Sequence, residues 1–174
     1  PIIILQPGQE HDTAVETEES VDLDAIRDDL AEVLGRHRTT RDEQRPKAVE
    51  KRHQQGHQTA RENLAQLLDD GSFLEYGALA VAAQRRRRSL EELVNRSPAD
   101  GLVAGTGSVN ADTFGADRSR CLALAYDYTV FAGTQGVMNH KKTDRLLKLA
   151  REWSMPVVLF AEGGGGRPGD TDFS

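Results

Sequence analysis

Four consecutive glycines, residues 163–166, follow almost directly on an apolar run that ends at Ala161. Glycine has no Cβ, so its backbone adopts positive φ freely and lets another backbone or a ligand approach closely. Successive N–H groups in such a turn can also point at one oxygen atom, which is the arrangement of an oxyanion hole. A flexible linker is the alternative, but a linker would not normally begin flush against an apolar strand. The run therefore predicts a strand that ends in a ligand-binding loop.

Other glycine-rich or nucleophilic sites fit the sequence less well. A dinucleotide-binding fingerprint needs an apolar helix directly after its glycines, and none follows within the chain. A Walker A motif needs Gly-Lys-Ser or Gly-Lys-Thr, and neither sequence is present. The chain also lacks a convincing Ser/His/Asp or Cys/His set. Backbone donors therefore explain the glycines better than a nucleotide phosphate does.

The cysteine and histidine content argues against a metal site. Cys121 is the single cysteine of the 174 residues, so an internal disulfide and a cysteine-based zinc cluster are both excluded. Its apolar neighbours favour a buried, inert thiol. His53 and His57 are four residues apart and could share a helix face, but without a third ligand nearby they are better interpreted as surface residues. We expect no metal.

Charge divides the chain into two parts. Residues 1–50 contain 13 acidic and 6 basic side chains, whereas residues 51–174 contain 15 acidic and 16 basic ones. Residues 9–20 are acidic and are expected to form a structureless linker. The net charge of −6 argues against bulk nucleic-acid binding, so the arginine run 85–88 is better explained by an exposed helix start or a subunit contact. Without an 18-residue apolar run or a signal-peptide pattern, we expect no membrane partner and a cytoplasmic location.

Helical signals occur in the first half of the chain. An apolar face followed by Gly35 as a stop predicts a helix over residues 21–34. The side chains of that face are Val21, Leu23, Ile26, Leu30, Val33 and Leu34. Pro46 is expected to open a second helical piece, and a capping box of Thr59 and Glu62 is expected to begin a helix that ends at Leu68.

The second half predicts strands separated by helices. Helices are expected at residues 85–95 and 137–153, the latter with Lys141, Lys142, Arg145 and Lys148 on its outer face. Strands are expected at residues 102–109, 120–128 and 157–161, the last of them buried. The near-continuous apolar run of the second strand predicts a central position covered on both faces.

Five blocks of the sequence, in order, resemble the carboxyltransferase domain of biotin-dependent acyl-CoA carboxylases. Residues 51–64 (KRHQQGHQTARENL) are similar to the family's entry motif, and residues 67–75 (LLDDGSFLE) continue it at the family spacing. Residues 100–107 (DGLVAGTG) resemble its first hairpin strand. Residues 127–136 (DYTVFAGTQG) resemble its Asp-x-Thr-x-x-Gly-Gly-Ser-x-Gly loop, and Lys142 matches a lysine of the following helix.

The resemblance implies a fold. The family belongs to the crotonase-like superfamily, in which ββα units stack around a CoA ester. The implied fold class is α/β, of the crotonase-like (ClpP/crotonase) type. Residues 46–174 would form the N-terminal portion only, incomplete and inactive alone, and residues 1–45 would precede it as an acidic linker with one amphipathic helix.

The resemblance also implies a reaction and its residues. Carboxybiotin would give up CO₂ to the α-carbon of an acyl-CoA, and negative charge would develop on the thioester oxygen. Alignment on Arg167 places the oxyanion-forming pair at Gly164 and Gly165. The family sequence Asp-Ser-Gly-Gly-Ala-Arg is replaced here by Glu-Gly-Gly-Gly-Gly-Arg, so the pair could be shifted by one residue. CoA would be bound by Arg61, Gly133, Lys142, Gly166 and Arg167, with Arg52 and Lys141 as weaker candidates.

Each of these basic side chains could instead be solvated or form a structural salt bridge. Biotin is expected on a separate biotinyl carrier domain, and a partner biotin carboxylase would use ATP and bicarbonate, which are not expected to bind here. Acyl-CoA, both modules and further copies of the chain, as a dimer or hexamer, are the implied partners. A biotin-dependent acyl-CoA decarboxylase with the same site and a non-catalytic CoA- or acyl-binding scaffold are the alternatives. A second glycine loop after Ser174 would favour an enzyme.

Overall fold

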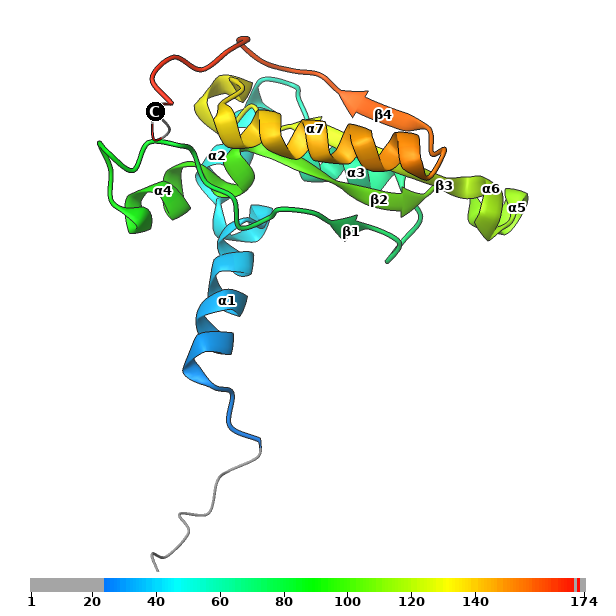
Figure 1. Cartoon of the computed structure of the whole chain (residues 1–174), viewed down its shortest axis with the longest axis horizontal. Coiled ribbons are helices and arrows are strands. Elements are labelled where there is room, and N and C mark those ends of the chain that lie inside the picture. Colours follow the sequence, from blue (N-terminus) through cyan, green and yellow to red (C-terminus); the bar gives the residue numbers. More distant parts are fainter. Residues whose placement is uncertain (1–23, 171, 173–174) are drawn as a thin grey trace, which may run out of the picture.

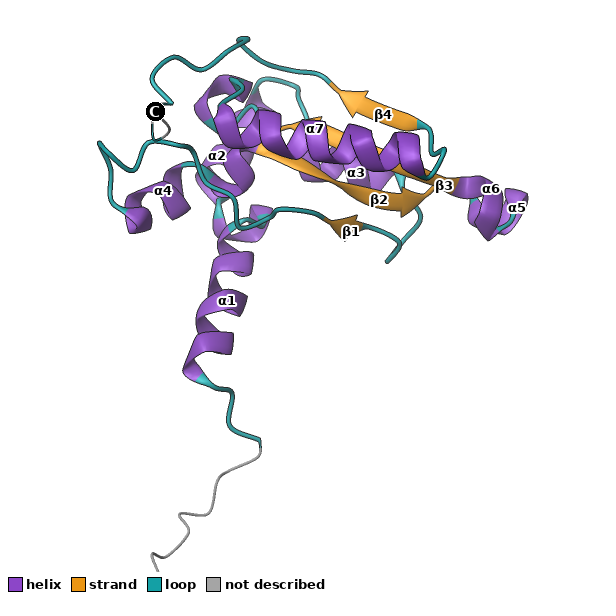
Figure 2. Ribbon diagram, in the orientation of Figure 1, coloured by secondary structure: helices purple, strands orange, loops and turns teal. Residues whose placement is uncertain are grey.

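A computed structural model describes residues 24–170 and 172. Its core is one four-stranded mixed sheet in the order β1-β2-β3-β4 (Figures 1 and 2). The strands are β1 (Leu74–Glu75), β2 (Leu102–Ser108), β3 (Arg120–Tyr126) and β4 (Val157–Phe160). β2 is antiparallel to both β1 and β3, whereas β3 and β4 are parallel. The predicted central position of β3 is therefore confirmed.

The sheet lies between two helices, α3 (Ala60–Leu67) and α7 (Val137–Glu152), as Figure 2 shows. Successive strand residues point to opposite faces, so β3 contributes to two separate cores. Cys121, Ala123 and Ala125 pack with Ala60 and Leu64 of α3 on one face. On the other face, Leu102, Ala104, Leu122 and Leu124 pack against Leu146, Leu149 and Ala150 of α7. The predicted burial of Cys121 is confirmed, and burial raises the pKa of its thiol.

Shorter elements complete the described chain. The α-helices are α1 (Asp28–Thr39), α2 (Pro46–Gln54), α4 (Leu90–Arg96), α5 (Ala111–Phe114) and α6 (Ala116–Ser119). The 3₁₀ segments are η1 (Asp42–Gln44), η2 (Pro98–Gly101) and η3 (Phe131–Gly133). Local signals placed two helix starts correctly, because Pro46 opens α2 and both hydrogen bonds of the Thr59–Glu62 capping box are present. Among the described residues, no helix is long and apolar enough to span a membrane.

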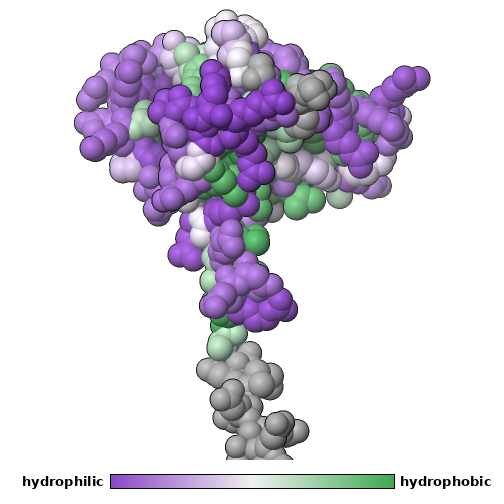
Figure 3. Space-filling model, turned by 60° about the vertical axis from the view of Figure 1, so that its left-hand side comes forward, coloured by the Kyte–Doolittle hydropathy of each residue, from purple (hydrophilic) through white to green (hydrophobic). Residues whose placement is uncertain are grey.

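The first predicted helix needs correction. α1 begins at Asp28 and continues through Gly35 to Thr39, so Gly35 does not stop it. The face expected to be buried is exposed, with Ile26 61% and Leu30 49% accessible, because α1 projects from the body of the domain (Figures 1 and 3). Val21, Leu23 and the linker of residues 9–20 lie outside the described residues.

Two later predictions also need correction. The helix expected from residue 85 begins only at Leu90, because Ser89 caps it by accepting from the Glu92 N–H and residues 85–88 form a turn. β4 was expected to be buried, but it is an edge strand with Val157 and Leu159 exposed by 41% and 46%.

Candidate active site at the glycine loop

The parallel pairing of β3 and β4 brings two loops together. Parallel strands end at the same edge of a sheet, so the loop after β3 and the glycine loop after β4 leave it side by side. The pairing resumes beyond the strands at Gln135 and Gly166. The Gln135 N–H donates to the Gly165 carbonyl oxygen at 2.8 Å, and the Arg167 N–H donates to the Gln135 carbonyl oxygen at 2.8 Å. The two loops therefore form one hydrogen-bonded unit.

Close backbone approach explains why glycine is required in both loops. A Cβ on Gly133 would lie 2.2 Å from the Glu162 carbonyl oxygen, and a Cβ on Gly163 would lie 2.1 Å from the Gly133 carbonyl oxygen. Gly133 also has φ of +66°, a conformation that side-chain-bearing residues rarely adopt. Glycine at both positions thus allows the loops to touch through their backbones.

The glycine loop presents backbone donors at the surface. Residues 163–166 are exposed, and Gly165 has φ of +84°. The N–H of Gly164 donates to the Ala132 carbonyl oxygen at 3.2 Å. The N–H groups of Gly165 and Gly166 donate to no group in the described part of the chain. Of the predicted pair, Gly165 is therefore available, and its available neighbour is Gly166 rather than Gly164.

The side chain of Arg167, directly after these donors, is buried. Its guanidinium pairs with Asp100 and, at 3.3 Å, with Asp170, and these three side chains are 5%, 0% and 2% exposed. It also donates to the Thr134 carbonyl oxygen at 2.6 Å and to the Thr134 hydroxyl at 3.3 Å. The Phe131 ring lies 4.8 Å from the guanidinium carbon. Arg167 therefore joins the glycine loop to the loop after β3.

The two carboxylates extend this network to α7. Asp170 accepts from the Val137 N–H at 3.2 Å, and Asp100 accepts from the Asn139 N–H at 2.7 Å. Burial raises the pKa of Asp100, although its hydrogen bond and ion pair with Arg167 act in the opposite direction. The first turn of α7, both loops and η2 are thus connected through buried charges.

The beginning of the glycine loop has its own anchor. Glu162 pairs with Arg52 of α2 at 2.6 Å, and the Arg52 side chain is only 6% exposed. Arg52 also donates to the Gln58 carbonyl oxygen at 3.1 Å and lies over the Tyr128 ring at 5.0 Å. Arg52 is therefore engaged in an ion pair, as the structural alternative to CoA binding predicted.

A pocket of about 510 Å³ adjoins the glycine loop. It is lined by Gln135, Gly136, Val137, His140, Gly166, Arg167, Pro168 and Asp170. None of these lining residues carries a hydroxyl or a thiol, and backbone donors, the Gln135 amide and His140 are among the polar groups of the lining. His140 is exposed on α7. Backbone N–H groups without a protein partner are the kind of donor that can bind a carbonyl oxygen and stabilise negative charge on it.

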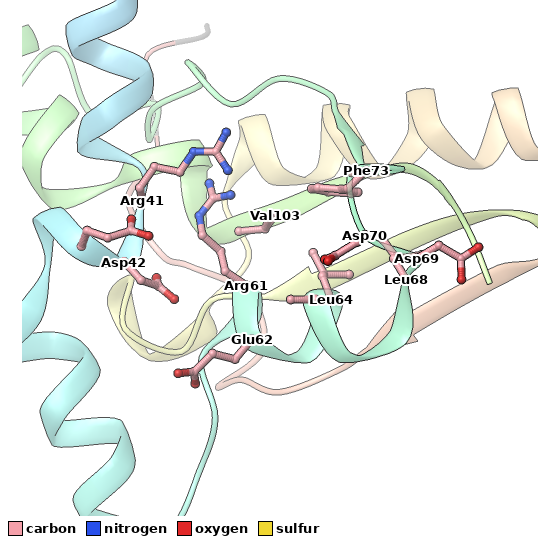
Figure 4. A pocket seen from close by; sticks show the side chains of 13 residues that line it. Arg41, Asp42, Arg61, Glu62, Leu64, Leu68, Asp69, Asp70, Phe73 and Val103 are labelled. Atoms are coloured by element: carbon pink, nitrogen blue, oxygen red, sulfur yellow. The ribbon is translucent and has the colours of Figure 1, made fainter. Parts of the chain in front are cut away.

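Arg61 lies in a different pocket, of about 410 Å³ (Figure 4). Its guanidinium donates to both carboxylate oxygens of Glu75, at 3.0 and 3.1 Å, and to the Thr40 carbonyl oxygen at 2.8 Å. The pocket shares no lining residue with the one at the glycine loop. The structure therefore does not bring Arg61 together with the predicted donors, and its role in CoA binding stays a prediction.

Lys142 points inward, which corrects its expected place on the outer face of α7. Its ammonium donates to the Ala99 carbonyl oxygen at 2.9 Å and to the Leu102 carbonyl oxygen, and the residue is 9% exposed. Burial lowers the pKa of Lys142 to about 8, against the opposing charges of Glu75 and Asp100. This lysine supports the backbone on both sides of Asp100, and its contact with CoA stays a prediction.

Sequence reasoning missed Asp100, Asp170 and Asn139 as parts of the site. A signal was available for one of them, because Asp100 lies in a matched block and the arginine after the glycines needs a counter-charge if buried.

His53 hydrogen-bonds Glu62 at 2.9 Å. Among the described residues no cluster of three or more His, Cys, Asp or Glu could hold a metal ion.

Comparison with known proteins identifies relatives of this chain. The family model described as the carboxyl transferase domain matches residues 51–171. A solved single-chain, multi-domain long-chain acyl-CoA carboxylase has 61% identity and a TM-score of 0.80 over 86% of this chain and 15% of its own.

Two curated relatives differ in activity. The biotin-dependent acetyl-/propionyl-coenzyme A carboxylase beta5 subunit of Mycobacterium tuberculosis is 32% identical over 158 residues, which are 90% of this chain and 27% of the subunit. The alpha subunit of methylmalonyl-CoA decarboxylase of Veillonella parvula is 36% identical over 121 residues, which are 70% of this chain and 22% of that subunit. The chain thus spans about a quarter of the length of these curated relatives.

Proposed function

The chain belongs to the carboxyl transferase domain family, and from that membership we propose that it forms the acyl-CoA-binding part of a biotin-dependent acyl-CoA carboxylase. Its similarity to a long-chain acyl-CoA carboxylase and to a biotin-dependent acetyl-/propionyl-CoA carboxylase subunit supports this proposal. The mixed α/β fold, expected as crotonase-like from the sequence, is shared with the matched carboxylase.

The pair of unengaged N–H groups at Gly165 and Gly166 carries the proposal. Loss of the α-proton of an acyl-CoA places negative charge on the thioester oxygen, and two adjacent backbone donors would stabilise that charge without a change in protonation. The 510 Å³ pocket, which Gly166 lines, offers room for the thioester group. Its lining has no hydroxyl or thiol, in keeping with a reaction that forms no acyl-enzyme ester or thioester.

Biotin is assigned to the whole assembly rather than to this part of it. When carboxylated and delivered by its carrier domain, it would supply the carboxyl group. The neutral N–H donors of Gly165 and Gly166 suit a carbonyl oxygen. The lining of the adjoining pocket does not contain a group of three or more His, Cys, Asp or Glu side chains that could hold a metal ion. We therefore assign to these residues the binding and orientation of the thioester and the stabilisation of its developing charge.

The proposal also covers the domain organisation of this chain and the partners of the complete protein. Residues 46–174 would be the front part of the carboxyltransferase domain and residues 1–45 a connecting segment. A carrier domain, a biotin carboxylase and further copies of the protein would complete a cytoplasmic enzyme. The exposed side chains of Val157 and Leu159 on edge strand β4 support the need for additional covering structure.

A decarboxylase is the second candidate, because the similarity to the methylmalonyl-CoA decarboxylase subunit extends over 70% of this chain. The direction can be measured on the complete protein with its partner subunits. A carboxylase fixes labelled bicarbonate into acyl-CoA only with ATP, and avidin blocks the fixation. ATP-independent release of CO₂ from a carboxyacyl-CoA, without ATP-driven fixation, would favour the decarboxylase.

Replacement of Gly165 tests the donor pair directly. Gly165→Val in the complete enzyme should lower kcat about 100-fold or more, because the positive φ at this position is strained for valine and both N–H groups would be displaced. Gly115→Val is the matched control, since Gly115 has a similar φ of +81°, a Cβ there also meets no atom within 4 Å, and the residue lies outside both loops of the site. Wild-type rates for Gly165→Val, measured with acyl-CoA as the varied substrate, would exclude this assignment.

A further inference from the structure

The side-chain contacts of Arg167 favour a role other than the CoA contact that the resemblance implies. We propose that Arg167, clamped between Asp100 and Asp170, is a positioning residue that fixes the Gly165 and Gly166 donors relative to the loop after β3 and to α7. The inference rests on the proposed function, because it assigns Arg167 an effect on the oxygen-binding donors.

The guanidinium of Arg167 is almost fully engaged, which leaves little room for a phosphate. Each of its three nitrogens donates to a neighbour: Nε to the Thr134 hydroxyl, one terminal nitrogen to Asp100 and Asp170, and the other to the Thr134 carbonyl oxygen. Only 5% of the side chain is exposed. A phosphate would therefore have to compete with these partners for a side chain that is almost inaccessible.

The main chain of Arg167 binds the same neighbouring loop as its side chain. The backbone N–H donates to the Gln135 carbonyl oxygen, and the guanidinium donates twice to Thr134. On the other side of the donors, the Gly164 N–H donates to the Ala132 carbonyl oxygen, and between the two donors the Gly165 carbonyl oxygen accepts from the Gln135 N–H. The two donors therefore lie within a short segment that is held at both ends, and movement of Arg167 would release one end.

The partner carboxylate Asp100 is itself held independently of the glycine loop. Ala99 and Asp100 both have positive φ, +53° and +48°, which is costly for non-glycine residues and persists only where the surroundings fix it. Lys142 binds the carbonyl oxygens of Ala99 and Leu102 on either side, and the Asn139 N–H binds the carboxylate. Asp100 is thus a fixed point against which Arg167 can be located.

Geometry also explains why arginine is needed at this position. A planar guanidinium can bind a carboxylate, a hydroxyl and a carbonyl oxygen at the same time in fixed directions, which a lysine ammonium cannot. Oxyanion donors act only when they are about 2.7–3.1 Å from the developing charge. A small displacement of the loop should therefore lower the rate of the chemical step more than the affinity for CoA.

Arg167→Lys in the complete enzyme tests the proposal, with Arg45→Lys as the matched control. Arg45 pairs with Asp127 at 2.8 Å, and these side chains are 15% and 10% exposed, so the control alters a mostly buried pair that makes no hydrogen bond to residues 163–170. We expect kcat for Arg167→Lys to fall about 10- to 100-fold, and KM for acyl-CoA to rise less than about threefold. Both constants should change less than about threefold in Arg45→Lys.

A binding comparison separates positioning from a general structural role. The probes are the acyl-CoA that the enzyme carboxylates best and the S-alkyl-CoA thioether of the same length, which lacks the carbonyl oxygen. Wild-type protein should prefer the thioester, and Arg167→Lys should lose that preference while binding the thioether normally. An unchanged preference and an unchanged kcat in a folded Arg167→Lys would overturn the proposal.

If Arg167→Lys does not fold, Thr134→Val is tested instead. This substitution removes the hydroxyl that accepts from Arg167 Nε and nearly conserves the side-chain volume. It should lower kcat several-fold, and a wild-type kcat with an unchanged preference would overturn the inference. Equal binding of the two probes to the wild-type protein would instead contradict the proposed oxygen site, whatever the Arg167 variants show.

Discussion

The side chains of α1 are not buried, whereas the charged side chains of the glycine-loop region, Asp100, Arg167 and Asp170, are buried. No residue of α1 is buried, and its apolar residues Leu30 and Val33 are 49% and 41% exposed. Its side-chain bond to the body of the domain is a hydrogen bond of Arg36 to the Leu79 carbonyl oxygen at 3.0 Å. In the glycine-loop region, by contrast, Arg167 and Asp100 are almost completely buried and each has several partners.

The difference shows which part of the fold depends on one particular arrangement of side chains. A buried ion pair contributes little net stability compared with well-packed apolar residues, because desolvating two charges is costly. Removing one partner, however, leaves the other charge buried and alone. The polar network therefore fixes the geometry of the loops. Substitutions of exposed side chains in α1 should change the stability of the described chain little. Substitutions in the two regions should accordingly differ in their cost.

The largest expected effect is that of Asp100→Ala. It should lower the free energy of unfolding by about 3–5 kcal/mol, because Arg167 would keep a buried charge without its main partner. Arg96→Ala is the control, since the Arg96–Glu92 pair is 50% and 39% exposed and should contribute about 0–1 kcal/mol. Urea unfolding of both variants measures the difference, and equal losses would abolish the contrast between buried and exposed pairs.

A pH dependence should follow from Lys142. Its pKa is about 8 in the folded protein and 10.5 as the ordinary value, so the unfolded chain binds more protons between these limits. Stability should therefore rise with pH across this window, by about 3 kcal/mol at most. The measured quantity is the unfolding free energy of the wild type minus that of Lys142→Met from about pH 7.5 to 10.5. A difference that does not change with pH would mean that Lys142 is not buried in its charged form.

Much of the fold could be predicted because its signals are local. The capping box at Thr59 and the apolar run of β3 each depend on neighbouring residues. The direction of Lys142 was also readable, since it shares helical spacing with the buried Leu146 and Leu149. By contrast, the partners of Arg167 come from residue 100 as well as residue 170, and pairings over such separations leave no periodic pattern.

The site was predictable only in part for the same reason. The glycines after β4 identified the loop, but the choice between Gly164 and Gly166 depends on whether the Ala132 carbonyl oxygen is near enough to accept a hydrogen bond. That contact arises from the loop after β3. Similarly, the amphipathic pattern around Leu30 predicts a helix but does not specify what covers its apolar face.

The same substitution, glycine to alanine, should have opposite effects in the two regions. Gly35 lies inside α1 in helical conformation, and a Cβ there would meet no atom within 4 Å. Gly35→Ala should therefore stabilise the chain by up to about 0.5–1 kcal/mol, because alanine loses less backbone entropy in a helix. At Gly133 the φ is +66° and a Cβ would lie 2.2 Å from the Glu162 carbonyl oxygen, so Gly133→Ala should destabilise the chain by about 1–3 kcal/mol. Urea unfolding together with helix content from circular dichroism measures both changes. A loss of stability in Gly35→Ala would show that α1 is bent or closely packed at Gly35, and the contrast between the two regions would then fail.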